Sequence, residues 1–563
     1  MLVLFAVSPL LVVAVLLVGL RWPASRVMPL SLLTAVVVAR WVWRIDDVQI
    51  AAAGLKGLVI TLELLSIIFF ALLMLRTLDR SGGLGVIRQG FSTLSPDPRI
   101  QAILIAWLFG SFIEGAAGFG TPAAVAVPLL IALRFPPAAA VMCGMMIQCT
   151  PVSFGALGTP ILVGVQSGLS AGESLWNGSS PRPTLMLIAA RVALVHAAVG
   201  TFIPLIMSCM LTRWFGVKRS YREGWEVWRF ALAAGMSMTI PYTMVAFVLG
   251  PEFPSLFGGM IGLVIMITVL RVRRNGTAGK TPWRFAETLR GEEAKTLRGE
   301  EVAPSGRPLD PPDARTSAGR PMSLAKAWMP YVVLAALLVA TRWPVLPLGR
   351  WIRSDPVTLR FAEVFGTSVS IVSTPLALPS FVFAVAIALT ALVHRLAPGA
   401  FLAAMKDSFG TTLKASVALI FTVPMVQIFL NSSGGVAELP SMPLVLAGWM
   451  AECVGGAWPM VAPAVGGLGA FVAGSNTISN MMLSSFQYGV GQRIGADPLW
   501  IVALQAVGGA AGNTICVHNV VSACAVGNLV GQEGFVIRRT LPVFLYYAAV
   551  AGMIGLGWAA LGR

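Results

Sequence analysis

The sequence predicts an all-α integral membrane protein with about 12 to 14 transmembrane segments, in two halves that are repeats of each other and contain broken or re-entrant helices. Three observations lead to this prediction. Hydrophobic residues make up 56% of the 563 residues and charged residues only 11%, whereas an ordinary soluble domain has about 25% charged residues. Many apolar runs reach about 20 residues, the length that spans about 30 Å of hydrocarbon. Several of these runs are interrupted by glycine and proline.

Composition also excludes other classes of protein. The net charge of +16 would suggest nucleic-acid binding in a soluble protein. Here the basic residues lie mostly between apolar segments, which is typical of cytoplasmic loops, so we expect no nucleic-acid partner. The six cysteines and three histidines are scattered and include no C-x-x-C, and we therefore predict neither a metal site nor a cofactor.

The candidate membrane spans fall into two groups. In the first half, residues 1–271, they are 2–20, 27–44, 57–76, 101–134, 137–168, 184–211, 230–250 and 254–271. In the second half, residues 328–563, they are 328–342, 379–396, 412–430, 442–459, 460–488, 498–530 and 540–560. We predict broken helices around 110–125, 153–165, 466–480 and 508–520, because glycines gather in all four ranges and the first two also contain proline.

A hydrophilic segment, 272–327, joins the halves. It is rich in proline, glycine, arginine and glutamate and contains a tandem repeat, 288–293 and 296–301. Such a segment cannot bury enough apolar surface to order its backbone, so we predict a disordered linker. Basic residues are concentrated in the loop 213–229 and at 271–274, where the linker begins. We therefore expect the loop and the linker to lie on the cytoplasmic side.

The chain is organised around residues 110–122, Gly-Ser-Phe-Ile-Glu-Gly-Ala-Ala-Gly-Phe-Gly-Thr-Pro. Glycine and proline free backbone N–H and C=O groups. At membrane depth, such groups are tolerated only where they face protein or a water-lined cavity. The motif therefore predicts a broken helix at membrane depth, where transporters bind their substrates.

This signature recurs at regular offsets. Gly120-Thr121-Pro122 is repeated as Gly158-Thr159-Pro160, 38 residues later, and Asn476-Thr477 as Asn513-Thr514, 37 residues later. Thr121 and Thr477 are 356 residues apart, and Thr159 and Thr514 are 355 apart. The matched spacing indicates an internal duplication, which we expect to be inverted.

Polar residues in these apolar surroundings are the candidate functional groups. Glu114 is a candidate for proton coupling, because a carboxylate at membrane depth is costly unless it is protonated or paired; it could equally cap a helix break or pair with a fixed cation. If helices begin at the breaks, their N–H groups would form an anion site there. The candidate substrate-binding residues are Gly118, Gly120, Thr121, Thr159, Asn476, Thr477, Asn513, Thr514 and His518, although several of them could simply cap the breaks.

These residues resemble the L-lactate permease family of bacterial monocarboxylate transporters, whose members import lactate or glycolate by proton symport. The resemblance covers nearly the whole chain apart from the linker. The motifs that carry it are 110–122, Thr-Pro-Val-Ser-Phe-Gly-Ala-Leu-Gly-Thr-Pro-Ile-Leu at 150–162, Phe-Gly-Thr-Thr-Leu-Lys at 409–414 and Gly-Ser-Asn-Thr-Ile-Ser-Asn at 474–480. The family also resembles a wider group of ion transporters with inverted repeats and re-entrant hairpins.

Two positions depart from what the resemblance implies. We would expect an aspartate where this chain has Asn476 and a lysine where it has Asn513. The change removes an acid and a base together. This chain could therefore recognise a different organic acid or couple transport differently.

The sequence thus predicts a transporter of the bacterial inner membrane, not an enzyme, that carries a small organic acid such as L-lactate together with protons. A sodium-coupled carboxylate transporter is the alternative, because the Asn-Thr pairs offer neutral oxygens of the kind that a hard cation accepts. A membrane-embedded enzyme is a different class. It would need a cluster of catalytic groups near one interface, and the sequence contains no phosphate loop, H-E-x-x-H or G-x-S-x-G motif. The sequence does not indicate an oligomeric state.

Overall fold

The computed structural model describes residues 1–13, 15–16, 20, 22, 24–92, 94–118, 120–169, 180–273, 283–286, 322–342, 347–352, 354–529 and 532–561. The molecule is nearly all-helical, with 81% helix and 2% strand. The predicted all-α class is therefore confirmed, with one short sheet added to it.

Eight helical segments in this part of the chain are long and apolar enough to cross a membrane. They are 47–80, 98–117, 151–169, 182–215, 228–248, 254–272, 442–471 and 533–561. Shorter apolar helices of 10–17 residues accompany them. Burial differs among the long segments. The most apolar window of 98–117 is 94% buried within the protein, whereas that of 533–561 is 39% buried, so the outer helices are the ones that can face lipid.

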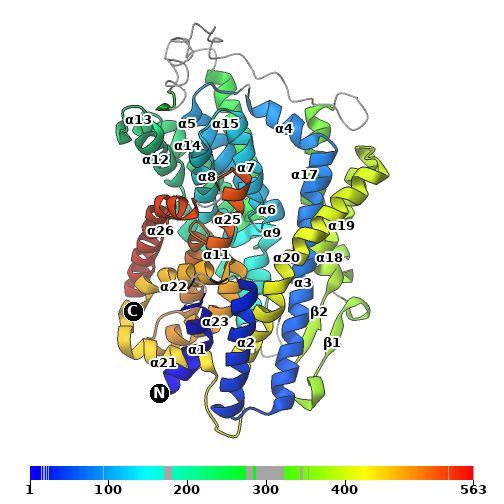
Figure 1. Ribbon diagram of the computed structural model, residues 1–563, viewed down its shortest axis with the longest axis vertical. Helices are drawn as coiled ribbons and strands as arrows, with labels where there is room; N and C mark the ends of the chain where they lie inside the picture. The colour runs from blue at the N-terminus through cyan, green and yellow to red at the C-terminus, as the bar shows by residue number, and fades with distance from the viewer. Residues whose placement is uncertain are drawn as a thin grey trace.

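Two long helices from different halves pack side by side along one flank of the molecule (Figure 1): α3 (Asp47–Arg80) and α20 (Pro398–Leu430). With 34 and 33 residues, each is about 50 Å long at about 1.5 Å per residue. They contact closely, because a Cβ added at Gly57 would lie 2.4 Å from the Pro424 Cα. An ion pair, Arg80 to Asp407 at 2.5 Å, also links them.

Shorter elements surround this pair. Their bounds are α1 (Leu2–Val13), α2 (Ala24–Trp41), α4 (Gly83–Ser92), α17 (Leu324–Arg342), α18 (Pro347–Trp351), η6 (Asp355–Val357), η7 (Val364–Gly366), η8 (Pro375–Ala377) and α19 (Pro379–Val393). The strands β1 (Leu359–Phe361) and β2 (Ile371–Ser373) pair antiparallel, with Leu359 opposite Ser373. This hairpin is attached to α3, since the Ser373 hydroxyl donates a hydrogen bond of 2.5 Å to the Glu63 carboxylate.

The first half then contains a helical hairpin and a broken helix. The first hairpin consists of α5 (Pro98–Ala102), η2 (Ile103–Phe109), α6 (Gly110–Ala117) and α7 (Thr121–Ala132). The first broken helix consists of α8 (Pro137–Met146), η3 (Ile147–Cys149), η4 (Pro151–Phe154), α9 (Gly155–Thr159), η5 (Pro160–Val165) and α10 (Gln166–Leu169). Five further helices follow: α11 (Arg182–Gly200), α12 (Ile203–Phe215), α13 (Tyr221–Trp225), α14 (Trp228–Val248) and α15 (Pro254–Arg273).

The second half repeats this order. After α21 (Met442–Val454) and η9 (Gly455–Ala457), the second hairpin consists of α22 (Trp458–Ala473) and α23 (Asn476–Arg493). The second broken helix consists of α24 (Pro498–Gly512) and α25 (Val517–Val526), and α26 (Glu533–Leu561) ends the chain. A hairpin followed by a broken helix thus occurs once in each half, at the positions where the matched motifs predicted interruptions.

The hairpins are re-entrant in the sense that their arms fold back on each other. In the first, α7 contacts both α6 and η2. A straight continuation would separate η2 from α7 by at least about 18 Å, so the chain must reverse at the tip. In the second, the Ser479 hydroxyl donates to the Gly466 carbonyl (2.8 Å), and the Gln487 amide donates to the Ala462 carbonyl (3.3 Å).

Most of the predicted linker lies outside the described residues. One short piece of it, 283–286, packs on the first half. Phe285 forms an isolated β-bridge with Gly216 and contacts the Phe135 ring at 4.9 Å between centroids. The Trp283 indole N–H donates to the Glu223 carboxylate at 3.1 Å. In Figure 1, α13 lies at one end of the molecule, and both chain termini lie toward the opposite end.

Candidate functional site

The tip of the first hairpin is formed by glycines. Gly118 and Gly120 have φ values of +62° and +77°, which L side chains rarely adopt, so glycine allows the reversal here. A new helix, α7, then begins at Thr121. Its N-cap is Gly120, which has no side chain to cap the free N–H groups.

The first broken helix changes geometry several times along its length. Two 3-10 turns replace α-helix over 147–154, and Ala156, Leu157 and Gly158 all have positive φ, between +44° and +79°. A left-handed conformation costs a non-glycine residue about 1–2 kcal/mol. Such strain persists where surrounding structure fixes it, and it concentrates at functional sites.

The tip of the second hairpin repeats the arrangement of the first. Gly474 ends α22 in a left-handed conformation (φ +79°), and α23 begins at Asn476. The N-cap residue Ser475 makes no side-chain cap hydrogen bond. Both hairpin tips therefore carry helix N-termini without a side-chain cap.

In the second broken helix, no helix begins at the Asn-Thr pair. Asn513 is the C-cap of α24, and the next helix begins only at Val517. The apolar run preceding Asn513 continues the α-helical ladder up to Gly512. Asn513 and Thr514 therefore lie at the negative end of a helix dipole, which favours cations or hydrogen-bond donors rather than anions.

The tip of the first hairpin contacts both broken helices. A Cβ added at Gly118 would lie 2.7 Å from the Ala156 Cβ, and one added at Gly120 would lie 3.3 Å from the Asn519 Oδ1. Ala156 belongs to the first broken helix and Asn519 to the second. One tip thus joins the two halves of the chain.

The tip of the second hairpin also contacts both broken helices. A Cβ added at Gly164 would lie 2.6 Å from the Thr477 carbonyl oxygen, and one added at Gly509 would lie 2.1 Å from the Asn476 Oδ1. Gly164 lies in η5 of the first broken helix and Gly509 in α24 of the second. The two tips therefore meet the same pair of broken helices.

Two buried hydrogen bonds further link segments of the two halves. The Asn519 amide donates to the Gln148 Oε1 at 3.0 Å, and the Asn480 amide donates to the Pro160 carbonyl at 3.2 Å. Their partners are 371 and 320 residues apart in the chain. Each hairpin tip thus lies against both broken helices, in the interior of the protein.

Three asparagines where the second hairpin meets α24 have amide atoms without a hydrogen-bond partner among the described residues. These atoms are Nδ2 and Oδ1 of Asn476, Oδ1 of Asn480 and Oδ1 of Asn513. A Cβ at Gly509 would lie 3.5 Å from the Asn480 Oδ1, and Asn513 follows Gly509 by one helical turn. A buried unsatisfied polar group costs about 1–3 kcal/mol, so we infer a polar ligand position here.

The threonines at the breaks behave differently. The hydroxyls of Thr121, Thr159 and Thr514 each donate to the carbonyl three residues earlier, at 2.7, 2.6 and 2.7 Å. These donors are therefore used within the local turn. The three hydroxyl oxygens retain lone pairs, which accept hydrogen bonds but do not bind an anion.

Glu114 lies at the first break. Its side chain is buried, with 2% of the residue exposed, and a Cβ added at Gly155 would lie 2.4 Å from its Oε1. Among the described residues, its Oε2 has no hydrogen-bond partner and Glu114 forms no salt bridge. The carboxyl group therefore packs on the backbone of the first broken helix instead of on a cation.

Sequence reasoning missed two residues that make these buried hydrogen bonds, Gln148 and Asn480. A signal for Asn480 existed, because it follows Asn476 by one helical turn and shares its face of α23. Gln148 was an isolated polar residue in an apolar run. The side chain of His518, a predicted contact, lies outside the part of the chain that the structure describes.

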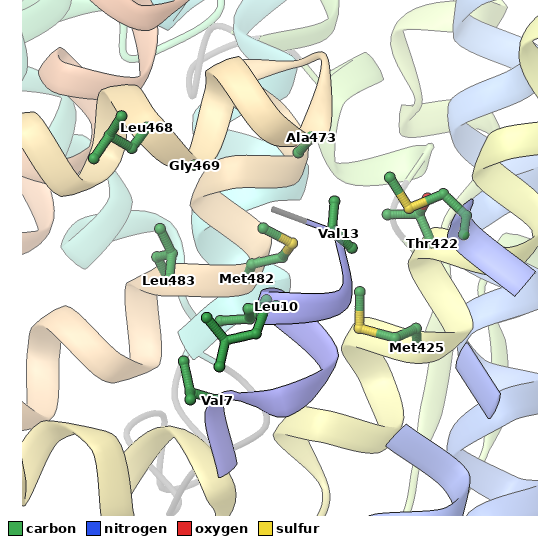
Figure 2. Close-up of a pocket in the computed structure, with 12 residues that line it drawn as sticks. Val7, Leu10, Val13, Thr422, Met425, Leu468, Gly469, Ala473, Met482 and Leu483 are labelled. Carbon is green, nitrogen blue, oxygen red and sulfur yellow. The ribbon is translucent and has the colours of Figure 1, made fainter. Parts of the chain in front are cut away.

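A separate cavity of about 200 Å³ lies between the second hairpin, α1 and α20 (Figure 2). Its lining is Val7, Leu10, Leu11, Val13, Met28, Thr422, Met425, Leu468, Gly469, Ala473, Met482 and Leu483. An almost wholly apolar lining cannot compensate the desolvation of a carboxylate. We therefore place no anion there.

Comparison of the sequence with known proteins indicates its family. The model of the family described as L-lactate permease matches residues 2–561. The glycolate permease GlcA of Escherichia coli is 27% identical over 98% of this chain and 95% of its own length. The L-lactate permease of Escherichia coli is 26% identical over 87% of this chain and 83% of its own length, and that of Bacillus subtilis 26% over 91% and 88%.

Among solved structures, the YdaH transporter of Alcanivorax borkumensis is similar over 88% of this chain and 85% of its own, with 14% identity and a TM-score of 0.39. The family match covers nearly the whole chain, and the apolar helices make it a multi-pass membrane protein, of the inner membrane in bacteria. The chain belongs to the L-lactate permease family.

Proposed function

We propose that this protein is a secondary active transporter that carries a small hydroxymonocarboxylate, L-lactate or a related acid such as glycolate, together with protons. The names of its relatives, lactate and glycolate permeases, support this substrate class. The observation that carries the proposal within the structure is the group of amide atoms on Asn476, Asn480 and Asn513 that have no hydrogen-bond partner among the described residues, beside an uncapped helix N-terminus.

The anion would bind at the start of α23. The first N–H groups of a helix have no partner within the helix and form the positive end of its dipole. Ser475 leaves them uncapped, and the Asn476 Nδ2 adds an unused donor. The amide oxygens of Asn480 and Asn513 could then accept the hydrogen bond of the substrate's hydroxyl group.

Glu114 would carry the coupled proton. An ionised carboxylate in a buried site is costly without a cation or hydrogen-bond donors, and the Oε2 of Glu114 has no hydrogen-bond partner among the described residues. Taking up a proton removes this cost. Release of the proton requires water to reach the side chain, which links protonation to a change in access.

A thermal-shift screen tests the substrate class. Glycolate and L-lactate should raise the melting temperature of the purified protein by a few degrees, because a ligand at about 100 times its Kd stabilises the native state by about 2.7 kcal/mol. Lactamide, which lacks the charge, and acetate, which lacks the hydroxyl, are the matched controls and should give smaller shifts. Equal shifts with lactamide and L-lactate, or none with any hydroxy acid, would argue against a hydroxycarboxylate site.

Sodium coupling is the second candidate, and one observation favours it. Three unpartnered amide oxygens, on Asn476, Asn480 and Asn513, lie near the negative end of α24, and a hard cation prefers such neutral oxygens. Proteoliposome uptake separates the two couplings. We expect an inward proton gradient to drive accumulation of the acid and a sodium gradient at equal pH to drive none; the reverse result would replace proton by sodium coupling.

A further inference from the structure

A chain of side-chain hydrogen bonds runs from the first broken helix to the last helix. The Ser153 Oγ lies 2.8 Å from the His196 Nε2, and the His196 Nδ1 lies 2.8 Å from the Tyr547 hydroxyl oxygen. The Tyr547 hydroxyl in turn lies 2.7 Å from the Thr150 Oγ1. All four residues are fully buried.

The directions of these bonds follow from a further contact. The Ser153 hydroxyl donates to the Ala506 carbonyl at 3.1 Å, so it accepts from the His196 Nε2–H. The His196 Nδ1 is then the acceptor of a neutral imidazole and receives the Tyr547 hydroxyl hydrogen. The Tyr547 hydroxyl oxygen can therefore accept a hydrogen bond from the Thr150 hydroxyl. Each of the three hydroxyl groups in this series of hydrogen bonds then has an acceptor for its hydrogen.

These hydrogen bonds contact the part of the first broken helix that lacks a continuous α-helical hydrogen-bond ladder. Over 147–154 the backbone is in short 3-10 turns, which leave carbonyl groups outside an α-helical ladder. Other helices satisfy two of these groups. The Tyr242 hydroxyl donates to the Thr150 carbonyl at 3.1 Å, and the Ser255 hydroxyl donates to the Pro151 carbonyl at 2.6 Å.

This segment lies directly between two parts of the candidate site. Gln148, which accepts the hydrogen bond of Asn519, lies near its start, and Gly155, against which Glu114 packs, follows its end. Fixing Thr150 and Ser153 therefore fixes both ends. Among the described residues, neither His196 nor Tyr547 hydrogen-bonds to Asn476, Asn480 or Asn513, so their effect on these asparagines is indirect.

We propose that His196 and Tyr547 are positioning residues that clamp the 3-10 segment of the first broken helix and thereby set the geometry of the acid site. This inference rests on the proposed function for its transport readout, but its structural readout does not. His196 lies on α11 and Tyr547 on α26. Their hydrogen bonds link the first broken helix to the last helix of the second half.

The structural test uses two neighbouring tyrosines. Tyr547→Phe removes the hydroxyl that joins His196 to Thr150, whereas Tyr546→Phe removes a hydroxyl that donates to the Val199 carbonyl on α11 (3.1 Å). Cys149, which is buried beside Thr150, reports on the segment. We expect Tyr547→Phe to speed its labelling by N-ethylmaleimide on the order of fivefold or more, because a buried hydrogen bond is lost.

Mass spectrometry of peptides from the whole protein gives this labelling, with the buried Cys143 on α8 as the internal reference. The proposal requires the ratio of Cys149 to Cys143 labelling to rise in Tyr547→Phe and to stay at the wild-type value in Tyr546→Phe. An equal rise in both variants, or a rise in neither, would overturn it. This result does not depend on which acid, if any, the protein carries.

The transport test uses His196. Glutamine offers an amide N–H to Ser153 and an oxygen to Tyr547, whereas leucine offers neither. We expect His196→Leu to raise the KM for the acid roughly tenfold with kcat nearly unchanged, and His196→Gln to restore most of the affinity. A wild-type KM in His196→Leu, or equal defects in both variants, would refute the positioning role. Absence of acid transport by the wild-type protein would instead refute the proposed function.

Discussion

Glu114→Gln should reduce proton-driven accumulation of the acid to background while leaving the protein folded. Glutamine is close in size to glutamate but cannot release a proton. In the structure, the Glu114 carboxyl is buried against Gly155 and has no ion-pair partner among the described residues. The measurement is uptake into proteoliposomes with an imposed pH gradient. Exchange of internal for external acid, which needs no net proton movement, should persist in the variant.

The matched control is Glu63→Gln. Glu63 is also a glutamate on a membrane-spanning helix, but it accepts a hydrogen bond from Ser373 on the short β-hairpin. We expect this variant to accumulate the acid at nearly the wild-type rate. If Glu114→Gln accumulates the acid normally, or if Glu63→Gln loses the same activity, then Glu114 is not the proton carrier.

Asn476→Ala should weaken acid binding by roughly 10- to 150-fold. Its Nδ2 is an unused donor beside the uncapped start of α23, and a hydrogen bond to a charged group contributes about 1.5–3 kcal/mol. The defect should appear in KM and in the Kd measured by calorimetry. Because alanine favours helix and removes a buried unsatisfied amide, we expect no loss of thermal stability.

The control for this prediction is Asn431→Ala. Asn431 caps the end of α20, where its amide donates to the Gln427 carbonyl at 2.7 Å. Its loss should lower stability slightly and leave KM unchanged. An unchanged Kd in Asn476→Ala would move the acid away from the second hairpin.

The positions of the interruptions were predictable from sequence, because their cause is local. Gly118 and Gly120 allow a reversal that other residues resist, and Gly474 does the same in the second half. The matched spacing of the Thr-Pro and Asn-Thr motifs showed in addition that the two halves correspond. The hairpins and broken helices occur at these places.

The partners of each interruption were not predictable from sequence, because they come from distant segments. Asn480 meets the Pro160 carbonyl across 320 residues, and His196 meets Tyr547 across 351. Nothing in the local pattern of either residue specifies such a partner. The end of α24 at Gly512 was not predictable for a related reason, since the motif Asn-Thr starts a helix in the second hairpin but ends one in the second broken helix.

An experimental structure of the protein with bound L-lactate or glycolate tests the central claim most directly. The account predicts carboxylate density within hydrogen-bonding distance of the Asn476 Nδ2 and the first N–H groups of α23, where the second hairpin tip meets both broken helices. Density in the apolar cavity between the second hairpin, α1 and α20, or at any other position away from the start of α23, would contradict it.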